Sequence, residues 1–446
     1  MISCVRRGTA AAALLSAMTA GPAAIADPPG DPATTFTAPM AAEEALRTNP
    51  DLRAAYAAID AARGRLLQAG LWPNPEAALG GRNDFAFQGE GERGISAEFA
   101  QRFPVAGRLA RAKDVAQVDV EIALAEARDF ERTLVGDVQR TVAGLVALDR
   151  ALETRESVLR IAGELVRIAA QRFEAAEVSE AEVNSLEIEL ARFQQEKRLL
   201  ELERRTEAIR LNRLLNRSPD RPAEVRGDLD QPLLASAAPA DLLAAARTHR
   251  PDLERLRLES DRWRAEARLA RAEAWEDWTL GGTYDSDRSV FRNEPVVDPI
   301  GIKHDSFLGL RLNVPLPLWN RNQGRVAEAQ ANESRARARL LALERSVEAE
   351  IETAAQRVAE LQRVAREYRE SLLPRVERNV SLLDRGYRQG LVSITALVQA
   401  EQQLADTALR NARTVGDLRQ AEVDLETAAG VSPLLVSASR HEETKP

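Results

Sequence analysis

Apolar residues recur every seven positions through two long stretches of this sequence. In the first stretch they are Val138, Leu145, Leu152, Leu159, Val166 and Phe173. In the second they are Leu340, Val347, Ala354, Leu361 and Tyr368, with a companion seam of Ile351, Val358, Ala365 and Leu372. This spacing aligns apolar side chains along one side of an α-helix, where a partner helix can cover them. It predicts helices that pack lengthwise as coiled coils.

The first stretch lies in a long segment that contains no proline. Ala, Glu, Arg and Leu dominate residues 105–218, and all of them are strong helix formers. A continuous helix over residues 108–173 would be about 100 Å long at a rise of about 1.5 Å per residue, which is too long for a compact globular domain. Pro374 interrupts the corresponding stretch later in the chain, and we expect a kink or a helix break there.

The chain is a tandem duplication. Three motifs occur twice in the same order: PDL at 50–52 and 251–253, LGG at 79–81 and 280–282, and RFEAAEVS at 172–179 answered by GYRQGLVS at 386–393. Repeats of this length indicate a pseudo-symmetric fold and not a short-period solenoid. Each half begins with a helical stretch, continues with two short alternating segments and closes with a long helical hairpin. Pro50 lies in the first turns of the first helical stretch, residues 40–71, or divides a short lead-in from the main helix.

The chain ends and the join between the halves set the expected boundaries. Arg6 and Arg7 precede an apolar run at 10–24 that leads into an Ala-x-Ala cleavage site, so we expect a signal peptide, ordinary unfolded export and a mature chain from Asp27. Four prolines within residues 218–239 predict irregular connecting structure. The expected parts are a signal peptide (1–26), a first structural repeat (27–226), a second structural repeat (227–436) and a C-terminal tail (437–446).

Charge and residue content exclude several classes of function. Loss of residues 1–26 removes two of the 61 basic residues and none of the 69 acidic ones, which takes the formal charge from −8 to −10 and argues against nucleic-acid binding. The single cysteine, Cys4, leaves with the signal peptide, so the mature chain has no thiolate ligand or cysteine nucleophile. The histidines, at positions 249, 304 and 441, have no metal-ligand or triad spacing. We expect no enzyme activity, no cofactor and no metal site.

Two pairs of short segments between the helical stretches alternate with period two, as strands with differently solvated faces do. One parity holds Leu79, Phe85 and Phe87, then Ile95, Ala97, Phe99 and Phe103, then Trp278, Leu280, Gly282 and Tyr284, and finally Leu308, Leu310, Leu312 and Val314. The other holds Arg82 and Asp84, then Ser96, Glu98, Ala100 and Arg102, then Thr279, Gly281, Thr283 and Asp285, and finally Gly309, Arg311 and Asn313. The sequence therefore predicts four strands with one oily and one polar face.

A soluble sheet packed on a helix and a membrane-spanning sheet both give this alternation. The export signal favours the membrane, as do the tryptophans at the segment ends, Trp72, Trp275, Trp278 and Trp319. After the signal peptide no stretch approaches the roughly 18 apolar residues of a spanning helix, so strands would have to do the spanning. Lipid tolerates only closed barrels among β structures, and the smallest have about eight strands. Four strands per chain therefore require an oligomer, with eight strands in a dimer or twelve in a trimer.

The sequence resembles the TolC-type outer-membrane efflux proteins, and within them the CzcC-like branch that serves heavy-metal cation pumps. The resemblance covers essentially the whole mature chain and rests on the duplicated PDL and LGG motifs, FPVAGR at 103–108, LPLWNRNQGR at 316–325 and the paired turns. It implies a mainly α fold with a small β part, in which long helical hairpins and four transmembrane strands per chain build a homotrimer with a twelve-stranded barrel. It also implies a periplasmic tunnel whose hairpin tips meet an adaptor coupled to an inner-membrane RND-type pump.

The resemblance assigns expected site residues. The adaptor-contacting tips are Ala176, Glu177, Val178 and Ser179 in the first hairpin and Gly390, Leu391, Val392 and Ser393 in the second. A pore constriction is expected among Glu180, Glu182, Ala396 and Gln399. The two glutamates of the first hairpin could form an acidic gate, and a solvated helix face explains them equally well. The second hairpin has Ala396 and Gln399 at the matching positions, which argues against an acidic gate there. The barrel lumen would be lined by Arg82, Asp84, Glu98, Arg102, Thr283, Asp285, Arg311 and Asn313.

The expected function is that of an outer-membrane duct that receives substrates from an adaptor and pump. The branch resemblance favours heavy-metal cations, while a duct for drugs or solvents and a type I secretion duct stay open. A periplasmic structural coiled coil is the non-transport alternative, and it leaves the four strands unexplained. The turns at 88–93 and 286–305 are expected to face the cell exterior, because barrels of this kind place their longer loops outside.

Overall fold

The computed structural model describes residues 35–85, 91–227, 238–292, 300–389 and 391–431. The expected signal peptide and C-terminal tail lie outside these ranges, as do Phe87 and Gly390. Every other residue singled out above for a tip, a constriction or a lumen is described.

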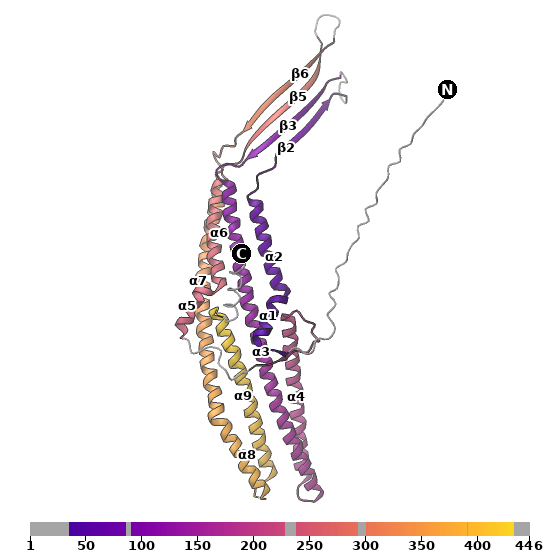
Figure 1. Cartoon of the computed structure of the whole chain (residues 1–446), viewed down its shortest axis with the longest axis vertical. Helices are drawn as coiled ribbons and strands as arrows, with labels where there is room; N and C mark the ends of the chain where they lie inside the picture. Colours follow the sequence, from indigo (N-terminus) through magenta and orange to yellow (C-terminus); the bar gives the residue numbers. More distant parts are fainter. Residues whose placement is uncertain (1–34, 86–90, 228–237, 293–299, 390, 432–446) are drawn as a thin grey trace, which may run out of the picture. The chain divides into compact units, whose positions relative to one another are not determined.

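Each sequence half folds into the predicted order of parts (Figure 1). The first half comprises α1 (Ala38–Thr48), α2 (Pro50–Ala69), β2 (Glu76–Asn83), β3 (Arg93–Phe103), α3 (Arg108–Glu174) and α4 (Glu180–Leu214). The second comprises α5 (Pro239–His249), α6 (Pro251–Ala272), β5 (Trp278–Arg292), β6 (Ile300–Asn313), α7 (Gln323–Glu367), the π-helical turn η1 (Tyr368–Leu372), α8 (Leu373–Arg388) and α9 (Ile394–Ala429). Short strands β1 (Thr35–Phe36) and β4 (Glu224–Val225) pair in parallel, so the join predicted as irregular contains one strand.

Prolines divide the helices where the sequence indicated. Pro50 begins α2, and Asn49 caps this helix by accepting hydrogen bonds from the backbone N–H groups of Asp51 and Leu52. Pro50 therefore divides a short lead-in helix from the main helix, as the second of the two predictions had it. In the second half, Pro374 stands in the first turn of α8, directly after η1. Since proline cannot donate the backbone hydrogen bond of an α-helix, the chain passes through a π-helical turn there.

The helices pack side by side in two sets that share α3 and α7. Next to the strands the neighbours are α2, α3, α6 and α7, and towards the hairpin turns they are α4, α3, α9 and then α7 with α8. α3 alone has 67 residues, about 100 Å of helix. Its seven-residue seam is fully buried at Val138 and Leu145, where α1 and α4 pack against it, but Phe173 near the turn is 45% exposed.

The four longer strands form one antiparallel sheet in the order β2-β3-β5-β6. The cross-strand register places Leu79, Ala97, Tyr284 and Leu308 in one row and Ala78, Glu98, Thr283 and Gly309 in the next, which confirms the predicted alternation. Phe85 lies beyond the end of β2, in a turn, so it is not part of a strand. Among the described residues, no helix is long and apolar enough to cross a membrane.

The expected turn at 286–305 is wrong in its extent. β5 continues to Arg292 and β6 begins at Ile300, with Ser286 opposite Ser306 and Asp287 opposite Asp305. The rows from Ser286 to Ser289, which pair with Ser306 to Lys303, are polar on both faces, so they lack the alternation by which a half-buried strand is recognised. Backbone hydrogen bonds between neighbouring strands hold them in place without that pattern.

Candidate functional site

The oily face of the sheet is uncovered in the part of the chain that the structure describes. Leu79, Leu308 and Leu310 are 85 to 87% exposed, so none of the described helices packs on this face. A soluble sheet resting on a helix would bury these side chains, because each buried leucine contributes roughly 2 kcal/mol of stability. The surface is instead of the kind that contacts lipid or another protein.

The opposite face is charged, and its charges are paired across strands. Arg82 contacts Asp287 at 2.5 Å, Arg102 contacts Glu76 at 2.8 Å, and Arg311 contacts Glu98 at 3.7 Å. Thr283, Asp285 and Asn313 share this parity, as the cross-strand register shows. The expected lumen residues in the strands therefore lie on one face. Asp84 directly follows β2, and one of its carboxylate oxygens is buried without a hydrogen-bond partner among the described residues.

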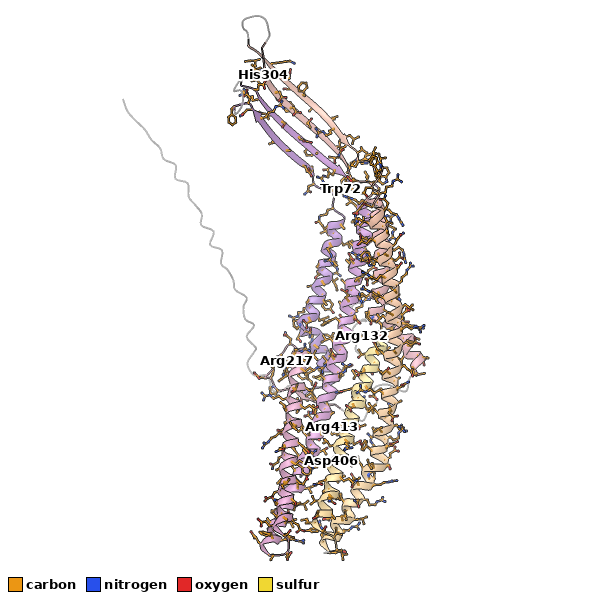
Figure 2. All side chains as sticks on the ribbon, turned by 180° about the vertical axis from the view of Figure 1, so that it is seen from behind. Trp72, Arg132, Arg217, His304, Asp406 and Arg413 are labelled. Carbon is orange, nitrogen blue, oxygen red and sulfur yellow. The ribbon has the colours of Figure 1, made fainter. Side chains whose placement is uncertain are left out.

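The two ends of the sheet differ in composition. His304 lies at the end of the sheet remote from the helices, where the register places it beside Arg288, and Trp72 lies at the end that joins them (Figure 2). Trp72 also packs edge-on against Phe103, with ring centroids 6.0 Å apart. Leucines and aromatic residues of the oily face occupy the rows between these two ends.

The predicted turns lie at hairpin tips, and both are capped by their serines. Ser179 accepts a hydrogen bond from the backbone N–H of Glu182, whose carboxylate accepts one from the Ser179 N–H, which completes a capping box. Ser393 accepts a hydrogen bond from the Ala396 N–H at 3.3 Å. Ala176, Glu177 and Leu391 are exposed, and Val178 and Val392 are half-buried. The tips therefore present short, fixed turns to solvent.

The expected constriction residues differ in what they can do. Glu182 is occupied in the capping box and Ala396 carries no polar group, whereas the side chains of Glu180 and Gln399 are exposed. Among the described residues, no group of three or more His, Cys, Asp or Glu side chains could hold a metal ion.

The two hairpins contact each other just behind the tips. Ala169, Leu186, Tyr387, Ile394 and Leu397 form one buried cluster drawn from α3, α4, α8 and α9. The guanidinium of Arg172 lies 4.6 Å from the centre of the Tyr387 ring, and the Tyr387 hydroxyl is buried without a hydrogen-bond partner among the described residues. These contacts join turns that are more than 200 residues apart in sequence.

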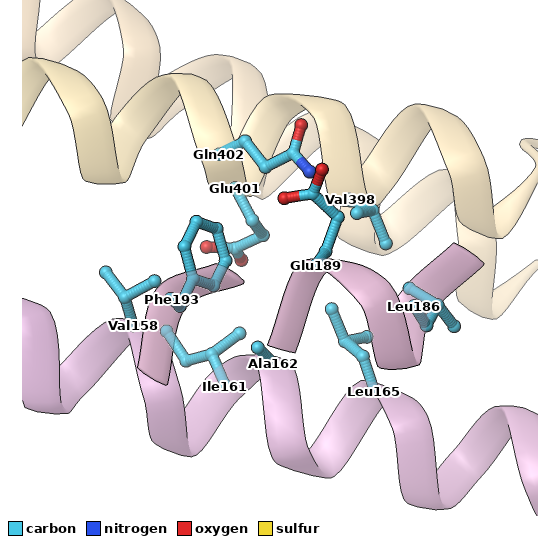
Figure 3. Close-up of a pocket in the computed structure, with 10 residues that line it drawn as sticks. All are labelled: Val158, Ile161, Ala162, Leu165, Leu186, Glu189, Phe193, Val398, Glu401 and Gln402. Carbon is cyan, nitrogen blue, oxygen red and sulfur yellow. The ribbon is translucent and has the colours of Figure 1, made fainter. Parts of the chain in front are cut away.

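Sequence reasoning missed two carboxylates at a small cavity between the hairpins (Figure 3). Glu189 of α4 and Glu401 of α9 line it together with Val158, Ile161, Phe193 and Val398. Burial, and secondarily the charge of Asp384, raises the pKa of Glu401. The duplication singled out Glu401, because it aligns with Glu187 when the two tip motifs are superimposed. Periodicity could not show that the side chain of Glu401 lines an apolar cavity.

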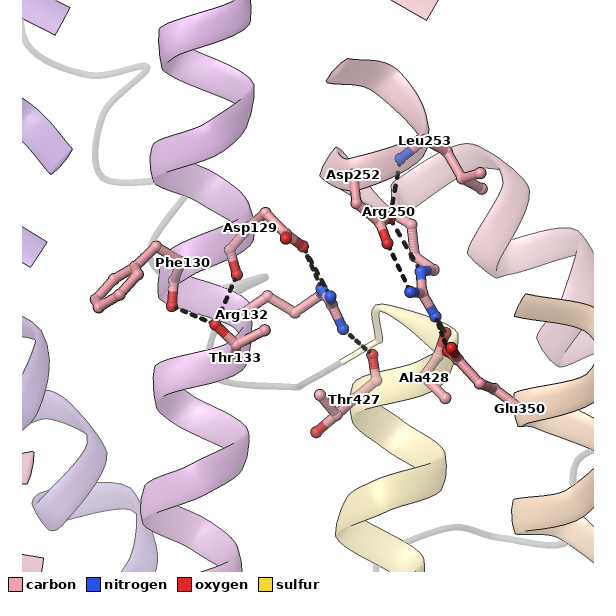
Figure 4. Close-up of polar contacts among 10 residues, drawn as sticks. All are labelled: Asp129, Phe130, Arg132, Thr133, Arg250, Asp252, Leu253, Glu350, Thr427 and Ala428. Carbon is pink, nitrogen blue, oxygen red and sulfur yellow. Dashed lines mark hydrogen bonds and ion pairs between the residues drawn. The ribbon is translucent and has the colours of Figure 1, made fainter. Parts of the chain in front are cut away.

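Sequence reasoning also missed two arginines that bind carbonyl oxygens at the end of α9 (Figure 4). Arg132 of α3 donates to the carbonyl oxygen of Thr427 at 2.7 Å, and Arg250 donates to that of Ala428 at 2.9 Å. Arg250 is 5% exposed and also pairs with Asp252 and Glu350. Burial of Asp252 opposes its ionisation, but the hydrogen bonds and charge of Arg250 outweigh it and lower the pKa of Asp252. These bonds anchor the C-terminal end of α9.

Comparison with known proteins agrees with this architecture. Residues 41–217 and 242–431 match the family described as "Outer membrane efflux protein". The chain is 22% identical over 407 residues to the cobalt-zinc-cadmium resistance protein CzcC of Cupriavidus metallidurans, covering 90% of this chain and 92% of that protein.

Solved structures with a similar fold include two bacterial outer-membrane proteins. The outer membrane protein VceC of Vibrio cholerae aligns with a TM-score of 0.68 at 20% identity, over 87% of this chain and 95% of VceC. The CmeC outer membrane channel of Campylobacter jejuni aligns with a TM-score of 0.69 at 16% identity, over 91% of this chain and 88% of CmeC. The mainly helical fold with a small sheet is therefore TolC-like.

Proposed function

Because the chain belongs to the outer membrane efflux protein family, whose members are channels and not enzymes, we propose that it is the outer-membrane duct of a tripartite efflux system. In this role the sheet lies in the outer membrane, the helices extend into the periplasm, and the hairpin tips meet a periplasmic adaptor joined to an inner-membrane pump. The expected signal peptide at 1–26 would export the chain.

The main support for this proposal is the structure of the sheet. Within the described ranges its oily face is uncovered, its opposite face is charged, and its outer strands β2 and β6 are each paired on one side only. Lipid does not satisfy an open strand edge, so spanning requires β2 of one copy to pair with β6 of the next. A trimer, the assembly of this family, closes twelve strands into a barrel with the charged face inward.

The helical layer supports the same assembly. α4 forms one flank of the layer near the turns, and its outward residues include Ile188, Leu199, Leu202 and Ile209, which are 42 to 66% exposed. These residues recur at helical spacing on one helix, so a neighbouring copy could cover them. A periplasmic structural coiled coil, the non-transport alternative, would need no oily sheet face.

Heavy-metal cations are the proposed cargo, and the similarity to CzcC supports them. In such assemblies the pump selects and the duct conducts, so a duct for drugs or solvents and a type I secretion duct are the competing functions. Deletion of the gene should sensitise cells to cobalt, zinc and cadmium if the cargo is metal. Sensitivity to dyes or detergents alone would favour the drug duct.

Surface labelling tests the location and orientation of the sheet. The expected mature chain has no cysteine, so His304→Cys, at the end of the sheet remote from the helices, should react with a membrane-impermeant maleimide in intact cells. Leu391→Cys at a tip is 77% exposed and should react only after the outer membrane is opened. Labelling of Leu391→Cys in intact cells, with His304→Cys protected, would reject the proposed orientation.

A further inference from the structure

The connection from β6 to α7 contains most of the motif LPLWNRNQGR, and it is longer than a link between strand and helix needs to be. The equivalent connection of the first repeat runs from Pro104 to Gly107, whereas that of the second runs from Val314 to Asn322 and is five residues longer. Both lead from a strand of the same sheet into a long helix. The first repeat shows that the short connection suffices, so the additional residues call for another explanation.

The longer loop exposes its apolar side chains. Leu316 is 64% exposed, Leu318 57% and Trp319 86%. In the shorter loop the exposed positions are Ala106 and Gly107, which carry almost no apolar surface. Three large apolar side chains close together in a water-exposed loop are unfavourable unless something covers them.

The polar side chains of the loop turn back onto its own backbone. Arg321 donates from Nε to the carbonyl oxygen of Pro317 at 3.3 Å, and Gln323 donates from Nε2 to that of Trp319 at 2.9 Å. Asn322, in the left-handed conformation at φ 55°, donates from Nδ2 to the Ala270 carbonyl at 3.1 Å and so ties the loop to α6. These bonds fix the loop and satisfy the carbonyl oxygens of Pro317 and Trp319, which suits a segment entering a region poor in water.

The loop directly follows β6, which contributes leucines to the oily face of the sheet. Leu308, Leu310 and Leu312 alternate along β6 on that face, and Leu316, Leu318 and Trp319 follow in the same stretch of chain. Trp72, Trp275 and Trp278 stand at the same end of the sheet and are 41 to 60% exposed. Tryptophan concentrates at the boundary between headgroups and acyl chains, because its ring is apolar and its N–H needs a partner.

We propose that the loop formed by residues 315–322 is a wedge that inserts into the inner leaflet of the outer membrane, with Trp319 at the level of the phospholipid headgroups. The wedge is specific to the second repeat, so a trimer would carry three of them at the junction of sheet and helices. It would hold the sheet at a set depth in the bilayer. The inference rests on the proposed membrane location of the sheet.

Brominated phospholipids test it, since bromine quenches only the tryptophans that touch acyl chains. The full-length mature protein is reconstituted into bilayers whose lipids carry bromine near the glycerol end or near the methyl end of the chains. The fluorescence of Trp319 is the difference between wild type and Trp319→Phe, a change that keeps the ring apolar. Bromine near the glycerol end should remove most of that difference, and bromine near the methyl end less.

Two matched variants separate the outcomes. Trp263→Phe removes a tryptophan within the helical layer, on α6, and its fluorescence should be insensitive to bromine. Leu310→Trp places a ring in the middle of the oily face and should be quenched most by bromine near the methyl end. An unquenched Trp319 beside a quenched Leu310→Trp overturns the wedge and leaves the channel intact, with the loop facing water or a neighbouring copy. An unquenched Leu310→Trp overturns the membrane location of the sheet and the wedge with it.

Discussion

The side-chain amide of Asn49 donates a hydrogen bond of 3.0 Å to the carbonyl oxygen of Leu214, which ties the start of α2 to the end of α4. The second repeat contains the counterpart, because Arg250 precedes Pro251 as Asn49 precedes Pro50, and Arg250 bonds to the carbonyl oxygen of Ala428 at the end of α9. In each repeat, the residue before the PDL motif thus ties the start of one helix to the end of the last helix of the hairpin. The last carbonyls of a helix lack intrahelical partners, and these side chains supply them.

Replacement of Asn49 by alanine should destabilise the first repeat by about 2 to 3 kcal/mol. The change removes the cap of α2 and leaves the buried Leu214 carbonyl without its donor. The shift in the denaturation midpoint of the purified protein measures the effect. Thr37→Ala is the matched control, since Thr37 precedes α1 without a side-chain cap bond, and it should change stability by less than about 0.5 kcal/mol. Equal effects of the two changes would contradict the role of Asn49 in tying α2 to α4.

Glycine at position 416 should be required for the close approach of α9 to α3. A Cβ atom there would lie 2.3 Å from Cβ of Ala147, so Gly416→Ala should force the helices apart at a cost of about 1 to 3 kcal/mol. Gly163→Ala on α3 is the control, because its Cβ would meet nothing within 4 Å and should stabilise the helix by about 0.5 to 1 kcal/mol. Thermal denaturation should move in opposite directions for the two variants.

Glu426 should make the helical layer less stable as pH rises. Burial, and secondarily the charge of Glu422, raises the pKa of Glu426 from 4.5 to about 7, so the fold favours its protonated form. That contribution is complete below the unfolded pKa near 4.5 and is lost as pH rises through about 7. One carboxylate oxygen of Glu426 is also buried without a hydrogen-bond partner among the described residues.

Replacement of Glu426 by glutamine should therefore stabilise the protein by about 1 to 3 kcal/mol at about pH 8 and change little at about pH 5. Denaturation midpoints at both pH values check this. Glu377→Gln removes an exposed carboxylate on α8 and should alter neither midpoint appreciably. A Glu426→Gln effect that is the same at both pH values would rule out the titration of this group as its cause.

The second hairpin tip should be needed for efflux and not for assembly. Ser393→Trp places a bulky ring beside the exposed Leu391 and should abolish resistance to the exported toxicants while the trimer stays inserted. The lost cap costs only about 1 kcal/mol. Ser393→Ala loses the same cap without the bulk, so it should retain resistance. Trimer abundance in outer membranes is measured beside resistance. Loss of the trimer in Ser393→Trp would instead make the turn a structural element.

Local sequence patterns were sufficient for the elements themselves. The absence of proline from 105–218 predicted α3 and α4, Pro374 the interruption at η1, and the alternation around Glu98 and Leu310 the two faces of the sheet. These features depend on backbone chemistry and on periods of two to seven residues, which a single chain displays directly.

Tertiary structure alone decided which distant residues meet. The sequence determined that an oily strand face and long helices exist. It did not determine that the oily face stays uncovered by the described helices or that β5 and β6 extend through polar residues. It also did not show that Arg132 and Arg250 meet the end of α9. Nor did it show that Glu401 lines an apolar cavity and that Glu426 is buried. Burial and pairing arise from contacts between segments hundreds of residues apart, and a helical or strand period reports only the face a residue lies on, never what lies opposite it.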